Sequence, residues 1–154
     1  MIDPPNIVHT AAQPAAVIRF TIPRAEIRNV MGPAMRELAE TAAAQGVGPG
    51  GPLFSHHFRM DPGIFDFVVG VPVTAAFSPV GRIESGQLPA AAVVQTIYHG
   101  PYEGLAAAWQ EFDNWIAANG YKIAGDLWER YVAGPESGPD QSQWRTELSR
   151  PLRA

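Results

Sequence analysis

The chain repeats one pattern of secondary structure, and this repeat constrains its fold more than any other feature. Residues 15–22 (AAVIRFTI) are rich in β-branched and aromatic side chains, as strands are, and a helical pattern follows as far as Gln45. Two further strands are predicted at 53–60 and 65–73. The same strand–helix–strand–strand order is predicted again at 91–99, 103–119, 127–132 and 144–152. Such a repeat predicts an α+β fold of two similar βαββ units with pseudo-twofold symmetry.

Single residues recur along with the pattern. Gly46 and Gly120 each follow a predicted helix, where glycine is the common terminating residue. Pro72 and Pro151 occupy matching places in the last strand of each repeat. The repeats run approximately from 7 to 75 and from 88 to 153. Because either half alone would leave a sheet face uncovered, we expect a single domain over residues 1–154.

Composition excludes several classes of function. The net charge is −4, the arginines are scattered, and Lys122 is the only lysine, so the basic patch that direct nucleic acid binding needs is absent. The N-terminus lacks the basic and apolar regions of a signal peptide. The run 15–22 is interrupted by Arg19 and is too short to span a membrane. We therefore expect a cytoplasmic protein without a membrane segment.

No metal or cofactor is expected. The chain has four histidines and no cysteine. His56 and His57 are neighbours on a predicted strand, so their side chains point to opposite faces, and His9 and His99 have no ligand-spaced neighbour. The glycine-rich loop GVGPGGP lacks the Lys-Ser/Thr pair of a phosphate-binding loop, and no Gly-x-Ser-x-Gly motif is present.

The stretch LWERYV holds the main candidate for chemistry. On a strand, Leu127, Glu129 and Tyr131 share one face. Matching the repeats places Glu129 on His56 and Tyr131 on Phe58. If both faces line a cavity, a cation could stack on the aromatic rings, worth roughly 0.5–2 kcal/mol, with Glu129 as its counter-charge. The alternative is that Glu129 forms a surface ion pair with an arginine such as Arg130 or Arg145.

Further aromatic residues are candidates for ligand binding. Tyr98 and Tyr102 flank the His-Gly-Pro sequence at a strand-to-helix junction, where Tyr102 could point into a groove and Tyr98 could simply pack in a tight turn. Trp109 lies on the apolar stripe of helix 103–119, where packing in the core is the default. Trp144 and Phe65 occupy matched positions in the repeat, which favours a structural role for both.

Over essentially its whole length, the chain resembles the GyrI-like effector-binding domain, which also forms the ligand-binding part of multidrug-responsive transcription regulators. In that family His-Gly-Pro-Tyr opens the second helix, Gly-x-x-x-Glu-x-Tyr lies on the next strand, and Thr-Glu-x-x-x-Pro lies on the last. The matching residues here are His99, Gly100, Pro101 and Tyr102; Gly125, Glu129 and Tyr131; and Thr146, Glu147 and Pro151. Many members continue with Asp-Pro after the tyrosine, where this chain has Ala133-Gly134-Pro135.

The resemblance implies antiparallel sheets around a central groove that is lined by aromatic and acidic side chains. It implies binding of bulky apolar or cationic aromatic compounds, with sequestration or detoxification as the outcome. One alternative is hydrolysis of strained, cyclopropane-bearing compounds, with Glu129 activating water and Tyr131 or Tyr102 donating a proton. Another is a protein partner, as in a DNA gyrase inhibitor. Binding and hydrolysis need the same acid in the same apolar slot, so both stay open at this point.

Overall fold

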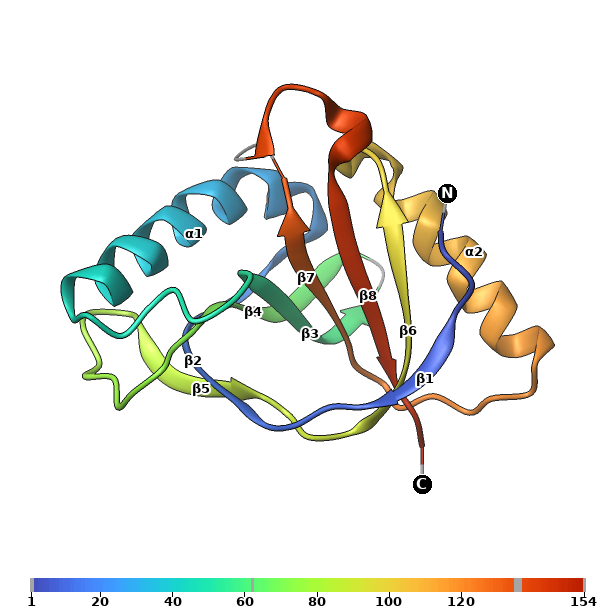
Figure 1. Cartoon of the computed structure of the whole chain (residues 1–154), viewed down its shortest axis with the longest axis horizontal. Coiled ribbons are helices and arrows are strands. Elements are labelled where there is room, and N and C mark those ends of the chain that lie inside the picture. Colours follow the sequence, from blue (N-terminus) through green and yellow to red (C-terminus); the bar gives the residue numbers. More distant parts are fainter. Residues whose placement is uncertain (1, 62, 135–136, 154) are drawn as a thin grey trace. The chain divides into compact units, whose positions relative to one another are not determined.

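The computed structural model describes residues 2–61, 63–134 and 137–153 (Figure 1). The chain divides into two units. The N-terminal unit spans Ala11–Ala90, and the C-terminal unit runs from Ala91 onward and takes in the residues up to Thr10 as well. Within the described residues, each unit has one long helix and four strands paired in antiparallel fashion, which confirms the α+β class.

The N-terminal unit contains the predicted strand–helix–strand–strand order and one additional strand. Its elements are β2 (Gln13–Pro23), the 3-10 turn η1 (Arg24–Glu26), α1 (Ile27–Ala44), β3 (Phe54–Asp61), β4 (Ile64–Pro72) and β5 (Glu84–Leu88). The strands pair in the order β3-β4-β2-β5. Strand β5 falls in a stretch for which the sequence predicted no strand. Pro33 lies inside α1, and Gly46 follows the helix with a φ of 69°.

The core of this unit lies between α1 and the sheet. Ala34, Leu38 and Ala42 recur every four residues along α1 and are completely buried. They pack on β4 and β2 through the residues of those strands that point to the helix: Ala16, Ile18, Phe20, Phe67, Val69 and Val71. The alternation of these buried positions identifies the helix-facing side of the sheet.

The C-terminal unit also contains the predicted order plus one strand. Its elements are β1 (Asn6–His9), β6 (Ala92–His99), the 3-10 turn η2 (Tyr102–Gly104), α2 (Leu105–Ala118), β7 (Leu127–Ala133), the 3-10 turn η4 (Gln141–Gln143) and β8 (Arg145–Pro151). The strands pair in the order β1-β6-β8-β7. Strand β1, which the sequence did not predict, forms one edge of this sheet beside β6.

Helix α2 covers one face of the C-terminal sheet, beside β6 (Figure 1). Ala108, Phe112 and Ile116 are its buried residues, and they pack against Val94, Tyr98 and Leu148 of β6 and β8. Leu105 and Trp109 of the predicted apolar stripe are only partly buried against this cluster. The helix ends before Gly120, whose φ is 75°.

The strand registers correct one step of the residue matching between the repeats. With Pro72 matched to Pro151, Val69 corresponds to Leu148. Val69 pairs with Ser55, and Leu148 pairs with Glu129. Glu129 therefore corresponds to Ser55 rather than His56, and the predicted matches of Glu129 with His56 and of Tyr131 with Phe58 are wrong by one residue.

A shift of one residue moves a side chain to the other face of a sheet. His56 and Phe58 accordingly lie on the face of their sheet that points away from α1, whereas Glu129 and Tyr131 lie on the face of theirs that α2 covers. The shared element order agrees with an internal repeat. The pseudo-twofold symmetry and the single domain stay predictions.

Candidate functional site

Glu129 lies on β7 and points toward α2. Its Oε2 accepts a hydrogen bond from the indole Nε1 of Trp109 at 2.6 Å, and its Oε1 accepts one from the hydroxyl of Tyr131 at 2.7 Å. The carboxylate is partly buried, opposite the buried Leu148. Two neutral donors thus fix the orientation of the carboxylate at the edge of the core.

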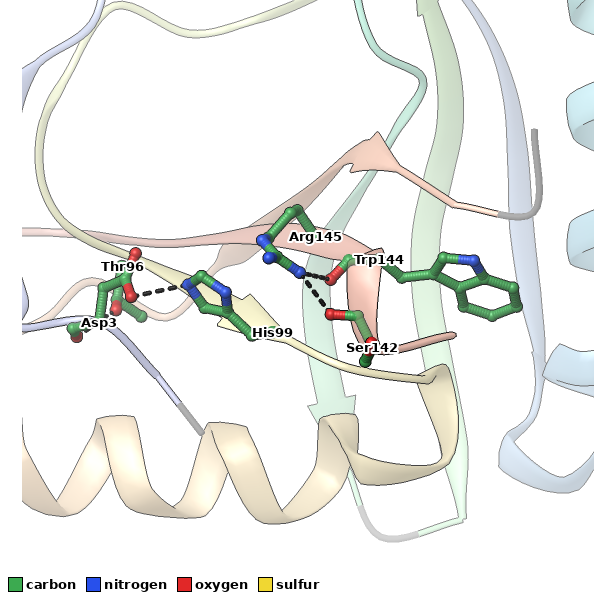
Figure 2. Close-up of polar contacts among 6 residues, drawn as sticks. All are labelled: Asp3, Thr96, His99, Ser142, Trp144 and Arg145. Carbon is green, nitrogen blue, oxygen red and sulfur yellow. Dashed lines mark hydrogen bonds and ion pairs between the residues drawn. The ribbon is translucent and has the colours of Figure 1, made fainter. Parts of the chain in front are cut away.

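The arginines that the sequence offered as ion-pair partners of Glu129 are engaged elsewhere. Arg130 lies on the opposite face of β7 and donates from Nη1 to Glu147 Oε1 at 2.8 Å. Arg145 donates from Nη1 to the backbone oxygens of Ser142 and Trp144, both at 2.8 Å (Figure 2). Both arginines thus have partners other than Glu129, and the surface ion pair stays an alternative prediction.

Three neighbouring aromatic rings begin next to Glu129, and we call Tyr131, Tyr102 and Trp144 the aromatic row. The rings of Tyr131 and Tyr102 are 5.9 Å apart, edge to face. The rings of Tyr102 and Trp144 are 5.1 Å apart. Tyr102 is 37% exposed, which is high for an aromatic side chain. The row places aromatic surface next to a carboxylate within one unit.

The turn that precedes β8 positions Trp144 in the aromatic row. Arg145 holds the carbonyls of Ser142 and Trp144, and the indole lies on the other side of the strand, pointing away from Arg145 (Figure 2). Its Nε1 donates to the backbone oxygen of Gly138 at 3.3 Å. Sequence reasoning assigned Trp144 a structural role. The sequence signal for a ring near the surface is its position directly after a loop of small and polar residues.

Tyr98 is buried at the strand-to-helix turn, as the packing alternative expected. It is 5% exposed, and its hydroxyl donates to the backbone oxygen of Pro101 at 2.8 Å. A side chain at Gly104 would overlap this hydroxyl. Burial, together with the Glu103 carboxylate, raises the pKa of Tyr98 above its usual value. The role of Tyr98 as a ligand contact stays a prediction and has no support from this position.

His56 and Phe58 belong to the N-terminal unit and contact one another. Their ring centroids are 4.4 Å apart, and the guanidinium of Arg19 lies 5.0 Å from the Phe58 centroid. Arg19 in turn forms an ion pair with Asp66 at 2.9 Å. Their predicted part in the same ligand site as Glu129 stays a prediction.

His57 points into the core below α1. Its ring stacks on Phe67 at 4.8 Å, and its Nε2 lies 3.1 Å from the hydroxyl of Ser55. Nδ1 is buried and has no hydrogen-bond partner among the residues that the structure describes. Burial, with a smaller contribution from His56, lowers the pKa of His57 to about 4, so the buried ring is neutral at pH 7.

The histidines are dispersed rather than gathered around a metal. His99 pairs through Nε2 with Asp3 at 2.7 Å, and the hydroxyl of Thr96 donates to the Asp3 carbonyl at 2.6 Å (Figure 2). These contacts tie the first residues to β6. Among the described residues, no three His, Asp or Glu side chains are placed to hold one metal ion. No helix in the described part of the chain is long and apolar enough to cross a membrane.

The N-terminal unit contains an open hollow of about 510 Å³ that the sequence did not suggest. Small and apolar residues from the beginning of β2, from the segment that follows β4 and from β5 line it: Pro14, Ala15, Val73, Thr74, Ala75, Ala76, Phe77, Ser85 and Gly86. The hollow has no charged side chain, in contrast to the surroundings of Glu129.

Several solved chains share this fold at low sequence identity. The C-terminal domain of EcmrR superposes with a TM-score of 0.78 at 20% identity and covers 97% of each chain. In an EcmrR–DNA complex the TM-score is 0.80 at 20% identity, and the match covers 97% of this chain but only 57% of EcmrR. SAV2435 bound to tetraphenylphosphonium has a TM-score of 0.72 at 12% identity and covers 99% of this chain and 95% of its own. A hydrolase from Listeria innocua has a TM-score of 0.64 at 14% identity, with 97% and 91% covered.

These structural similarities show the fold alone, whereas a family model identifies the family of the chain. Among curated proteins, none matches this chain. The model described as GyrI-like small molecule binding domain matches residues 3–153 and so includes both units. The chain therefore belongs to the family of GyrI-like small molecule binding domains.

Proposed function

We propose that this domain binds bulky aromatic cations at Glu129 and the aromatic row, and that it acts by sequestering them. The observation that carries the proposal is the Glu129 carboxylate, which Trp109 and Tyr131 orient at 2.6 and 2.7 Å beside exposed aromatic surface. A cytoplasmic location and the absence of direct nucleic acid binding belong to the same proposal.

The physical basis is the combination of a negative charge with flat apolar surface. An aromatic cation gains a cation–π contact of roughly 0.5–2 kcal/mol on each favourable ring, and it buries apolar area at the same time. A carboxylate about 5 Å from the charge adds about 3 kcal/mol at an effective dielectric constant of 20. A neutral compound of the same shape gains only the burial.

Two comparisons support this choice of ligand. The chain belongs to a small-molecule binding family, and SAV2435, which shares its fold, was solved with tetraphenylphosphonium, a cation that carries four phenyl rings. The family model also extends over both units, which supports our proposal that the two repeats form one domain.

The test uses two probes of nearly equal shape and opposite charge. Tetraphenylphosphonium and tetraphenylborate are titrated by calorimetry into the wild type and into Glu129→Gln. Glutamine can accept the Trp109 bond through its oxygen and donate to the Tyr131 oxygen through its nitrogen, so the local contacts are retained. We expect the wild type to prefer the phosphonium, and Glu129→Gln to bind it at least about tenfold more weakly.

Glu111→Gln is the matched control, because it removes the same charge from an exposed position on α2. It should leave phosphonium binding unchanged. Equal affinity of the wild type for the two probes, or equal losses in Glu129→Gln and Glu111→Gln, would reject Glu129 as the recognition element.

Hydrolysis of a reactive ligand is the second candidate, and the Tyr131–Glu129 pair favours it. With a hydroxyl 2.7 Å from a carboxylate, Glu129 could take a proton from water while Tyr131 donates to the oxygen that gains negative charge. A solved chain with this fold is described as a hydrolase. After incubation of a cyclopropane-bearing electrophile with the wild type, mass spectrometry should show the addition of one water molecule. The rate of this reaction should be about 100-fold or more lower with Glu129→Gln. Unchanged substrate after incubation with the wild type would leave binding as the function. The gyrase-inhibitor alternative stays a prediction.

A further inference from the structure

One face of the Trp109 indole is covered by an arginine. The guanidinium carbon of Arg150 lies 5.8 Å from the ring centroid. Arg150 is on β8, on the sheet face that α2 covers, and its side chain is only 12% exposed. Arg150 Nη1 donates to the backbone oxygen of Asp126 at 3.4 Å. The arginine is therefore held in place and is not a mobile surface side chain.

Asp113 supplies the counter-charge of this arginine. Arg150 Nε donates to Asp113 Oδ1 at 3.2 Å. Asp113 follows Trp109 by four residues on α2, so one helix face carries both the ring and the carboxylate. Asp113, Arg150 and Trp109 form a stack that ends at the indole N–H, which donates to Glu129.

This arrangement has two physical consequences. A cation against the face of an indole draws electron density from the ring and makes its N–H a stronger donor. The same cation repels a second positive charge on that ring. Trp109 is thereby suited to orient Glu129 and is poorly suited to stack on a cationic ligand.

We propose that Arg150, held by Asp113, is a positioning residue of the Glu129 site. It fixes the Trp109 indole so that its N–H holds the carboxylate, and it leaves the aromatic row of Tyr131, Tyr102 and Trp144 as the surface for the cation. This inference rests on the proposed function, because Glu129 is the proposed ligand-binding group. The hydrogen bond between Trp109 and Glu129 can nevertheless be measured without any ligand.

The first experiment follows the indole proton of Trp109 by NMR. The chain has four tryptophans, and Trp109→Phe assigns the resonance. In Arg150→Met this proton should move upfield and exchange with solvent about 2- to 30-fold faster, as expected for the loss of one cation–π contact. Arg150→Lys keeps the charge and should recover part of the change. If Arg150→Met does not fold, Asp113→Asn should move the same resonance in the same direction.

Arg82 provides the matched control. It forms an ion pair with Glu37 at 2.7 Å and lies 5.5 Å from the ring centroid of Phe20, which has no polar N–H. Arg82→Met should leave the Trp109 proton unchanged. The proposal would be overturned if the chemical shift and exchange rate of the Trp109 proton did not change in Arg150→Met. The same holds for Asp113→Asn if Arg150→Met does not fold. An equal change in Arg82→Met would also overturn it.

The second experiment titrates tetraphenylphosphonium into the same variants. Arg150→Met should weaken binding about 2- to 30-fold, and in a Trp109→Phe background it should add nothing, because both changes act through one hydrogen bond. Additive losses in the double variant would overturn the positioning role. If the wild type does not bind the phosphonium at all, the proposed function fails, and the NMR result still decides the role of Arg150.

Discussion

Acid should destabilise the chain through the buried His57. The pKa of this residue is lowered to about 4 in the folded protein, because burial opposes the charge. In the unfolded chain the imidazole is in water, with an ordinary pKa near 6.5. As the pH falls below about 6.5, the unfolded state therefore takes up a proton first, and the free energy of unfolding decreases until the folded state is protonated near pH 4.

The magnitude follows from the difference between the two pKa values. One pKa unit corresponds to about 1.36 kcal/mol, so His57 should cost about 2 kcal/mol at pH 5 and about 3 kcal/mol at pH 4, relative to pH 7 and above. This is a large fraction of the usual 5–15 kcal/mol stability of a protein. A charged imidazole would need an acceptor for the proton on Nδ1, and the described residues provide none. The ring also stacks on the apolar ring of Phe67, so its surroundings favour the neutral form.

The assay is urea unfolding at several pH values between 4 and 8, followed by circular dichroism. His57→Phe keeps an aromatic ring against Phe67 and removes the titrating group, so its stability should fall less than that of the wild type between pH 6.5 and 4. Subtracting the two curves removes the contribution of the other titrating groups. His9→Gln, which removes an exposed imidazole from β1, should follow the wild type. Parallel curves for the wild type and His57→Phe would refute the reasoning.

Two further changes test the turn before α2 and the end of the aromatic row that is farthest from Glu129. Gly104→Ala should lower the free energy of unfolding by about 1–3 kcal/mol, because its Cβ overlaps the hydroxyl of Tyr98. Tyr98→Phe should recover part of this loss, and an equal loss with and without the hydroxyl in urea unfolding would contradict the steric explanation. Trp144→Ala should weaken tetraphenylphosphonium binding in calorimetry by about 1 kcal/mol through lost stacking. Trp115→Ala, which removes the ring stacked on Tyr121, should have no effect, and equal losses in the two variants would argue against a role for the row.

The sequence could predict the elements whose side chains follow a clear period. The apolar stripes of α1 and α2, the β-branched runs of β2, β4 and β6, and the glycines after both helices all have local signals. Strands β1 and β5 could not be predicted in this way. NIVH is only four residues long, and ESGQL contains no β-branched or aromatic residue. Pairing with β6 and β2 brings both into the sheets, which is a tertiary effect.

The candidate site was predicted in part. Glu129, Tyr131, Tyr102 and Trp109 were recognised as candidates, and the structure brings them together within one unit. The bond between Trp109 and Glu129 could not be predicted, because it depends on how α2 packs across the sheet. The one-residue error that matched Glu129 with His56 arose because similar letters in the two repeats gave no information on strand register, which the pairing fixes.

The most direct test of the binding proposal is to locate the ligand. Tetraphenylarsonium has nearly the shape and charge of tetraphenylphosphonium, and its arsenic atom scatters X-rays anomalously. In crystals grown with this cation, we predict an arsenic peak beside Glu129, with at least one phenyl ring within about 6 Å of the ring centroid of Tyr131 or Tyr102. An arsenic peak only in the hollow lined by Pro14 and Phe77 would contradict the proposal that Glu129 and the aromatic row form the binding site. The absence of any peak, when calorimetry shows that the protein binds the cation in solution, would contradict it as well.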